Sequence, residues 1–209
     1  MLLPRSRTKL EEFLPHVMAM VQGDSRPALP SNVALSYIRN AAIEFAKLSS
    51  VLRRTERIKI QDGNTAYPLV DEPDEEHIYR LVAVSRENGY LPPLRAHYED
   101  SVLYLDKGQS YSTSDCEDQY MLVDYVVIPT RNACKVDDIL YTDWHDAIVD
   151  GALSKIHLMP QRPWTSGVAS RERDRAFRTA AGEARVKFFT DRAGTESARV
   201  RLPLAARGC

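Results

Sequence analysis

Two amphipathic segments enclose a long stretch of β-type sequence, and this order constrains the fold more than any other feature. The segment from Leu140 to Trp164, LYTDWHDAIVDGALSKIHLMPQRPW, has the apolar spacing of a helix that ends at prolines. An equally strong helical pattern runs from Ser31 to Arg54. About eighty residues with β patterns separate the two segments. The sequence therefore predicts helices that bracket a β insertion.

Two further helices are predicted outside this pair. Residues 6–22 place apolar side chains three and four residues apart, although Pro15 inside the pattern kinks or splits a helix. A basic helix is predicted from about residue 166 or 170 to residue 191. The helix predicted within Leu140 to Trp164 begins near Thr142 or Asp143. One of its faces carries Trp144, Ile148, Ala152, Ile156 and Met159.

Short strands are predicted throughout the middle of the chain. The alternating RIKI sequence and the TAYPLV sequence flank Asp62-Gly63, and an Asp-Gly pair is a strong signal for a hairpin. Further strands are predicted at His77–Ser85, Leu94–Tyr98, Ser101–Leu105 and Gln119–Val127. Five or six strands of this length favour a small sandwich or barrel.

Together these elements predict an α+β fold. We expect an α-helical bundle of about four helices, an inserted small antiparallel β-sandwich or barrel module, and an extended C-terminal arm. The predicted units are the N-terminal helices of the bundle in residues 1–54, the β module in residues 55–139, the C-terminal helices in residues 140–192 and the arm in residues 193–209.

The predicted arm alternates apolar and polar residues without an obvious strand partner in this chain. We therefore expect it to pair with another chain, since an extended segment can add a strand to a partner through main-chain hydrogen bonds. The residues predicted for this contact are Ala198, Val200, Leu202 and Leu204.

Charge is distributed in three blocks along the sequence. Residues 1–59 carry 10 Lys/Arg against 5 Asp/Glu, residues 60–170 carry 8 against 19, and residues 171–209 carry 10 against 5. Such blocks are typical of ordinary solvated faces, but they also suit contacts with a surface of opposite charge. The candidates for a subunit interface are Arg171, Arg175, Arg178 and Arg185, and those for an acidic turn that faces a partner are Glu72, Glu75 and Glu76.

Several classes of protein are disfavoured. No apolar run approaches the ~18 residues that span a bilayer, and acidic residues stand where a signal peptide has its apolar core, so we expect a protein made in the cytoplasm without membrane association. Cys116, Cys134 and Cys209 lack metal-ligand or disulfide spacing and are expected to be free thiols.

No motif for catalysis or for a cofactor is present. The sequence lacks GxSxG, HExxH and the glycine-rich loops that bind phosphates, and its acidic run DEPDEEH lacks the spacing of a calcium loop. We therefore expect no enzymatic activity, no catalytic residue, no metal and no cofactor.

Four segments follow one another along residues 30–189 in the order NVALSYIRNAAIEFAKLSSVLRR, YPLVDEPDEEHIYRLVAV, WHDAIVDGALSKIHLMPQRPW and ARVKFF. In these segments and their order the chain resembles the head-to-tail adaptor, connector or neck proteins of tailed bacteriophages. The resemblance implies a virion protein at the head-to-tail junction, assembled in the host cytoplasm.

The resemblance also implies specific partners. Adaptors of this family form a ring, commonly of twelve copies, that docks under the portal protein, extends the DNA channel and gives the tail or nozzle protein its attachment surface. The DNA passes through the channel without sequence-specific binding. Two other functions stay open: a DNA-binding accessory protein of packaging that uses the basic helices, and a virion-associated cell-wall hydrolase with a pair of carboxylates in a cleft.

Overall fold

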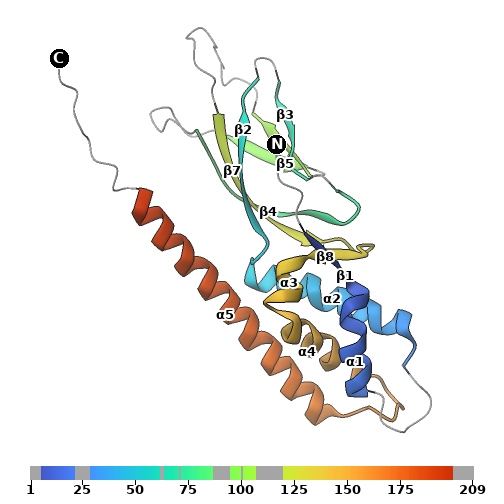
Figure 1. The fold of residues 1–209 in the computed structure, drawn as a ribbon. Helices are drawn as coiled ribbons and strands as arrows, with labels where there is room; N and C mark the ends of the chain where they lie inside the picture. The colour runs from blue at the N-terminus through green and yellow to red at the C-terminus, as the bar shows by residue number, and fades with distance from the viewer. Residues whose placement is uncertain are drawn as a thin grey trace, which may run out of the picture.

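The computed structural model describes residues 6–21, 29–61, 64–70, 72–86, 95–99, 101–106 and 120–199. In these ranges the chain is a mixed α/β structure with antiparallel sheets, none of them closed into a barrel. Figure 1 shows most of the helices at one end of the molecule and the larger sheets, which have three strands each, at the other. The barrel alternative of the sequence prediction is therefore wrong.

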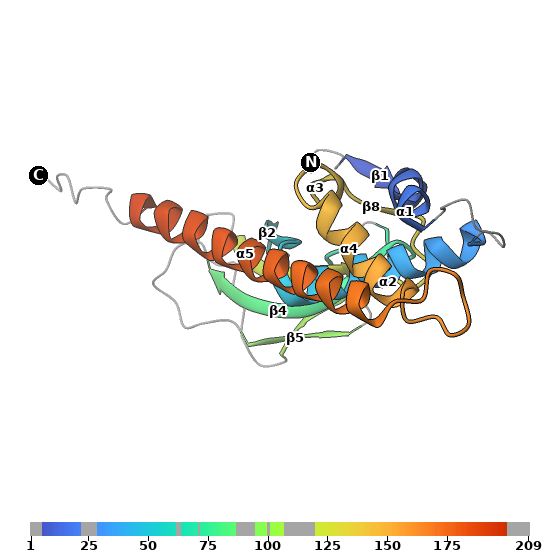
Figure 2. The ribbon, with the colours of Figure 1, turned by 90° about the horizontal axis from the view of Figure 1, so that it is seen from below.

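The described residues form five α-helices and a short 3-10 helix. The helices are η1 (Leu10–Phe13), α1 (Leu14–Val21), α2 (Ser31–Ser49), α3 (Asp138–Thr142), α4 (His145–Ile156) and α5 (Gly167–Arg199). Their apolar faces pack together: α2 contacts both α4 and α5, and α4 also contacts α1. Seen from below in Figure 2, α5 runs along α2 and α4. Within the described ranges, no helix is both long and apolar enough to cross a membrane.

Three antiparallel sheets account for the described strands. The strands are β1 (Arg7–Lys9), β2 (Arg53–Lys59), β3 (Ala66–Pro68), β4 (Glu76–Arg86), β5 (Ala96–Glu99), β6 (Val102–Leu105), β7 (Tyr120–Pro129) and β8 (Lys135–Asp137). The order is β2-β7-β4 in one sheet, β3-β6-β5 in a second, and β1-β8 in a small third sheet. The long apolar strand β7 is central because it is buried almost throughout and needs a neighbour on each side.

The predicted hairpin around Asp62-Gly63 does not form as a strand pair. The strand before it, β2, pairs with β7, and the strand after it, β3, pairs with β6. The two strands therefore belong to different sheets, and residues 62–63 lie outside the described part of the chain. The four later strands lie close to their predicted positions.

The N-terminal segment is not one helix. Residues 7–9 pair with residues 135–137, and Thr8 donates a side-chain hydrogen bond to Asp138. Pro15 lies in the first turn of α1, where a missing N–H costs nothing, so the α-helix begins beside the proline instead of running through it. The chain thus reaches α1 through a strand and the 3-10 turn η1.

The second helix is shorter than predicted. It ends at Ser49, and Ser50 takes the left-handed conformation (φ 56°) while its N–H donates to the carbonyl of Ala46. The prediction that Arg53 and Arg54 end this helix is wrong, because both begin strand β2. Their side chains reach carboxylates of the sheet instead of the helix C-terminus, Arg53 that of Asp124 and Arg54 that of Glu76.

The helix predicted after the β insertion has the expected apolar face, but it is divided into two helices, α3 and α4. Asp137 caps α3 by accepting a hydrogen bond from the N–H of Ile139, and α4 follows from His145. Ile148, Ala152 and Ile156 are fully buried, as their spacing predicted. The last helix also differs, since α5 continues to Arg199 and residues 193–199 are helical instead of extended.

The close approach of α4 and α5 depends on Gly151. A Cβ at this position would lie 2.6 Å from Cδ2 of Phe177 and 3.1 Å from Cβ of Ala41. We expect Gly151→Ala to lower the free energy of unfolding by about 1–3 kcal/mol, because the packed ring has little room to move. Chemical denaturation followed by circular dichroism measures this loss.

Gly182 supplies the matched control. It lies on the exposed surface of α5, and a Cβ there meets no atom within 4 Å. We expect Gly182→Ala to raise the free energy of unfolding by up to about 1 kcal/mol, since alanine favours a helix more than glycine does. A Gly151→Ala protein as stable as the native chain would show that α4 and α5 are not in this close contact.

Candidate functional site

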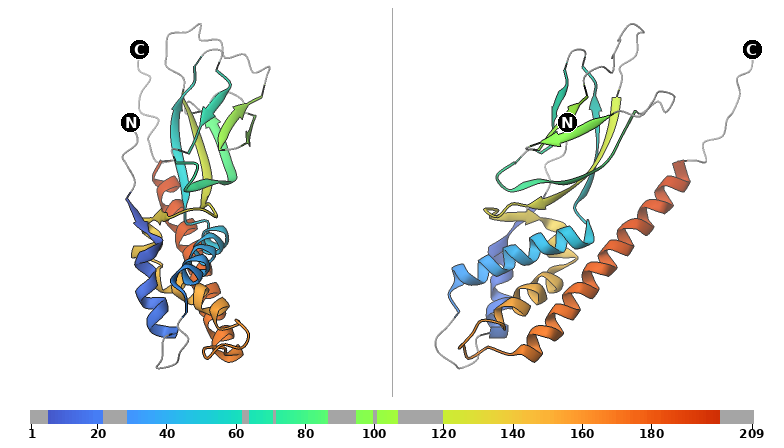
Figure 3. Two further views of the ribbon diagram at one scale, coloured as in Figure 1. Left: turned by 90° about the vertical axis from the view of Figure 1, so that its right-hand side faces the viewer. Right: turned by 180° about the vertical axis from the view of Figure 1, so that it is seen from behind.

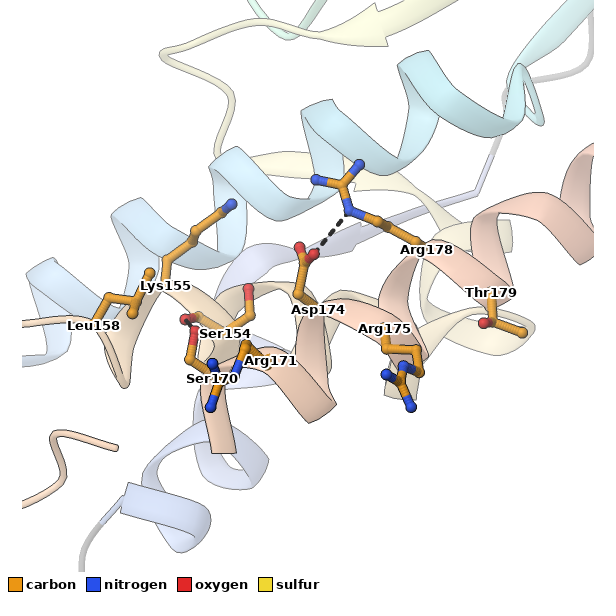
Figure 4. Close-up of a pocket in the computed structure, with 9 residues that line it drawn as sticks. All are labelled: Ser154, Lys155, Leu158, Ser170, Arg171, Asp174, Arg175, Arg178 and Thr179. Carbon is orange, nitrogen blue, oxygen red and sulfur yellow. Dashed lines mark hydrogen bonds and ion pairs between the residues drawn. The ribbon is translucent and has the colours of Figure 1, made fainter. Parts of the chain in front are cut away.

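A basic groove lies between α4 and α5. It has a volume of about 720 Å3 and opens to solvent, and Figure 4 shows the residues that line it. Four cationic side chains and one carboxylate surround it. The residues that line this basic groove are Ser154, Lys155, Leu158, Ser170, Arg171, Asp174, Arg175, Arg178 and Thr179.

Helix geometry brings three of the predicted interface arginines to this groove. Arg171, Arg175 and Arg178 are spaced by four and three residues, which places them on one flank of α5. The hydroxyl of Ser170 donates to the carbonyl of Ser154 over 2.7 Å and joins the start of α5 to the end of α4. The floor of the groove is therefore fixed by the helix contact, while the arginines stand at its edge.

The cations of the groove differ in their partners. Nε of Arg178 donates to Asp174 over 2.8 Å, and the same guanidinium lies 3.9 Å from Glu44 of α2. The hydrogen bond with Asp174, together with its charge, raises the pKa of Arg178. By contrast, neither Arg171 nor Arg175 has an ion-pair or hydrogen-bond partner among the residues that the structure describes. Two exposed charges at the groove are thus available to bind an anionic group.

The remaining predicted arginine lies elsewhere. Arg185 is exposed on α5, seven residues beyond Arg178, and does not line the groove. Lys155 and Asp174 also line the groove, although neither was among the residues predicted for the site. Lys155 is the one Lys or Arg of α4 and is exposed in its last turn, and this is the signal that could have singled it out.

The predicted acidic turn is mostly used inside the protein. Glu76 is buried and binds Arg54 through both carboxylate oxygens. Glu75 accepts hydrogen bonds from the N–H groups of Cys134 and Lys135 at 2.8 and 3.0 Å. Glu72 keeps an exposed side chain. The expectation that all three face a partner is therefore corrected for Glu76, which is buried, and for Glu75, which holds the loop before β8.

An ion cluster, buried at Arg54 and Glu76, joins the N-terminal strand β1 to the sheet β2-β7-β4. Arg7 lies 3.2 Å from both Glu72 and Glu76, and Arg54 also lies 3.9 Å from Asp137. Burial lowers the pKa of Arg54, but the hydrogen bond and charge of Glu76 outweigh it, so the pKa is raised. The Arg54 guanidinium therefore stays charged, and the cluster holds β1, β2 and β4 together.

A second buried polar contact supports the same sheet. The hydroxyl of Tyr125 on β7 donates to Glu56 on β2 and lies 2.7 Å from the carbonyl of Leu69. Burial, together with the hydrogen bond to Glu56, raises the pKa of Tyr125 far above its usual range. The phenol is therefore neutral at physiological pH and acts as a structural donor.

The structure places only part of the predicted C-terminal contact. Ala198 lies in helix α5 and not in an extended arm. Val200, Leu202 and Leu204 lie outside the described residues, so their role stays a prediction.

In the described part of the chain, no group of three or more His, Cys, Asp or Glu side chains could hold a metal ion. Cys134 is a free, exposed thiol. No protein-family model matches the sequence, and no curated protein matches it either.

Proposed function

We propose that this chain is a head-to-tail adaptor of a tailed bacteriophage, a structural subunit of a ring that docks under the portal. In this proposal α2, α4 and α5 are the core of the helical bundle, and the two three-stranded sheets form the sandwich-like inserted module. The ring extends the DNA channel and gives the tail protein an attachment surface. The partners are other copies of the chain, the portal and the tail or nozzle protein.

The length of α5 is the observation that carries this proposal. Its 33 residues correspond to about 50 Å of helix, whereas the 12 residues of α4 correspond to about 18 Å. The last core side chain of the described part of α5 is Ala184, and Figure 3 shows the helix continuing past α2 and α4. A helix that extends beyond its own core suits contacts with a neighbouring subunit or with the portal.

Electron microscopy of the purified chain mixed with a candidate portal tests the proposal. We expect rings bound end-on to the portal. A chain truncated after Thr190 keeps the buried residues Phe177, Ala181 and Ala184, so it should fold, but it should lose portal-bound rings because the projecting part of α5 is gone.

The Gly182→Ala chain is the control for that experiment, because it changes α5 without shortening it or altering its buried face. It should form the same portal-bound rings as the native chain. If the native chain leaves every portal bare, the adaptor proposal is wrong.

A DNA-binding accessory protein is the second candidate, and the cationic groove is the observation that favours it. Each phosphate that a Lys or Arg neutralises releases counterions, so this function requires duplex binding that falls steeply with added salt. It also requires that binding depend on Arg171 and Arg175. A ring subunit has no such requirement, because DNA must slide through its channel.

A further inference from the structure

The basic groove opens on a defined side of the helices. On one flank of α5, Arg173 binds Asp150 over 2.6 Å and approaches the sulfur of Met20 on α1. On the other flank, Arg178 points towards Glu44 of α2. Since Arg178 lines the groove and Arg173 does not, the groove opens away from α1.

A second charged surface lies where η1 meets the start of α4. The ring of Phe13 stacks on that of His145 with centroids 5.2 Å apart, which brings the end of η1 against the first turn of α4. The side chains around this point are exposed, and that of Asp146 is fully so. We call this surface the acidic corner; its members are Glu11, Glu12, Asp143 and Asp146.

Only part of the negative charge of the acidic corner is balanced by neighbouring basic side chains. Asp143 lies 3.8 Å from Lys187, and Asp146 contacts the ring nitrogen of His145. Glu11 and Glu12 have no ion-pair partner among the described residues. The corner therefore presents uncompensated negative charge, as the groove presents uncompensated positive charge.

The basic groove and the acidic corner lie too far apart to form ion pairs with each other within one molecule. Asp146 and Lys155 are nine residues apart at opposite ends of α4, a separation of about 13 Å along the helix. This exceeds the screening distance of about 8 Å at physiological ionic strength. The groove also opens away from α1, whereas the corner includes η1, which leads into α1.

We propose that the acidic corner of one copy docks in the basic groove of the next copy. The contact joins two different patches of the same chain, so it is head-to-tail, and repeated contacts of this type close into a ring when the rotation allows. This inference rests on the proposed adaptor function and specifies which faces of neighbouring subunits meet.

Complementary charge reversals test this contact. One variant carries Arg171→Glu with Arg175→Glu, and the other carries Glu11→Arg, Glu12→Arg and Asp146→Arg. Each variant alone has two like-charged surfaces, and we expect its self-association to weaken at least about tenfold. In an equal mixture, each surface of one variant meets an opposite surface of the other. Association should therefore return to the native level, as measured by sedimentation velocity.

Two further variants serve as controls. A chain with Arg162→Glu and Glu183→Arg reverses exposed charges outside both surfaces and should associate like the native protein. If circular dichroism shows that Asp146→Arg disturbs the fold, Glu11→Arg with Glu12→Arg removes the net charge of the corner without changing α4. Recovery in the mixture is the decisive result, because two merely misfolded variants would not restore each other.

Three outcomes would overturn the inference. The reversed variants could associate as tightly as the native chain, the native chain could remain monomeric at every concentration, or the mixture could fail to recover. Portal-bound rings of the native chain in electron microscopy would leave the adaptor function intact in each case. Duplex DNA binding that the Arg171→Glu, Arg175→Glu variant loses would assign the groove to DNA instead.

Discussion

The Glu76→Gln variant is expected to lose about 3–5 kcal/mol of the free energy of unfolding, because it removes one charge from a buried ion pair. Glu76 and Arg54 are 7% and 6% exposed at their side chains, and both carboxylate oxygens accept from the guanidinium. Arg7 also depends on this carboxylate, at 3.2 Å. A glutamine amide would leave two buried guanidinium groups near a partner without charge. Urea denaturation followed by circular dichroism measures the loss.

Glu72→Gln is the matched control for this prediction. Glu72 binds the same Arg7 at the same distance of 3.2 Å, but its side chain is 54% exposed. Water already solvates this carboxylate, so the expected loss is below about 1 kcal/mol. Equal losses in the two variants would mean that burial of the Glu76 charge does not govern the stability of this sheet.

Local patterns in the sequence predicted many of the elements. The alternation in EHIYRLVAVSR and the β-branched run in YMLVDYVVIP place strands β4 and β7 within two residues of their observed ends. The three- and four-residue spacing of Ile148, Ala152 and Ile156 correctly predicted the buried face of α4. These successes share a cause: each element buries a face whose period is visible within its own residues.

Pairing between distant segments was not predictable in the same way. Strand β1 finds its partner β8 about 130 residues later, and β2 pairs with β7 instead of the nearer β3. The Asp-Gly signal describes only a local turn, whereas the buried surface of β7 decides which strands lie beside it. Arg54 and Glu56 face the interior of this sheet, so the charged residues of RRTERIK hid the start of β2, and the alternating RIKI sequence indicated only its end.

The candidate site was predicted only in part for a similar reason. The spacing of Arg171, Arg175 and Arg178 predicted a common flank of one helix, and all three line the groove. The second wall of the groove comes from α4, and no pattern in α5 alone could supply Lys155. Two members of the predicted acidic turn bind within the protein, since Glu76 has partners on β1 and β2 and Glu75 binds the loop before β8, whereas Glu72 stays exposed.

Phe177→Ala is the second variant with a large expected effect. The ring is 2% exposed, packs directly over Gly151 and lies 5.9 Å from the ring of Phe45. Its removal leaves a cavity between α2, α4 and α5, for which we expect a loss of about 3–5 kcal/mol in the free energy of unfolding. Because this ring anchors the part of α5 that carries the groove arginines, self-association should weaken as well.

Val186→Ala is the control for Phe177→Ala, because it also shortens a side chain of α5 but at an exposed position. Val186 is on the same helix but is 65% exposed, so its truncation should change the free energy of unfolding by less than about 0.5 kcal/mol. Hydrogen exchange provides the structural readout: amides near the start of α5 should exchange faster in Phe177→Ala and at the native rate in Val186→Ala. Native exchange rates in both variants would mean that the start of α5 is held by contacts other than the Phe177 ring, such as the hydrogen bond between Ser170 and Ser154.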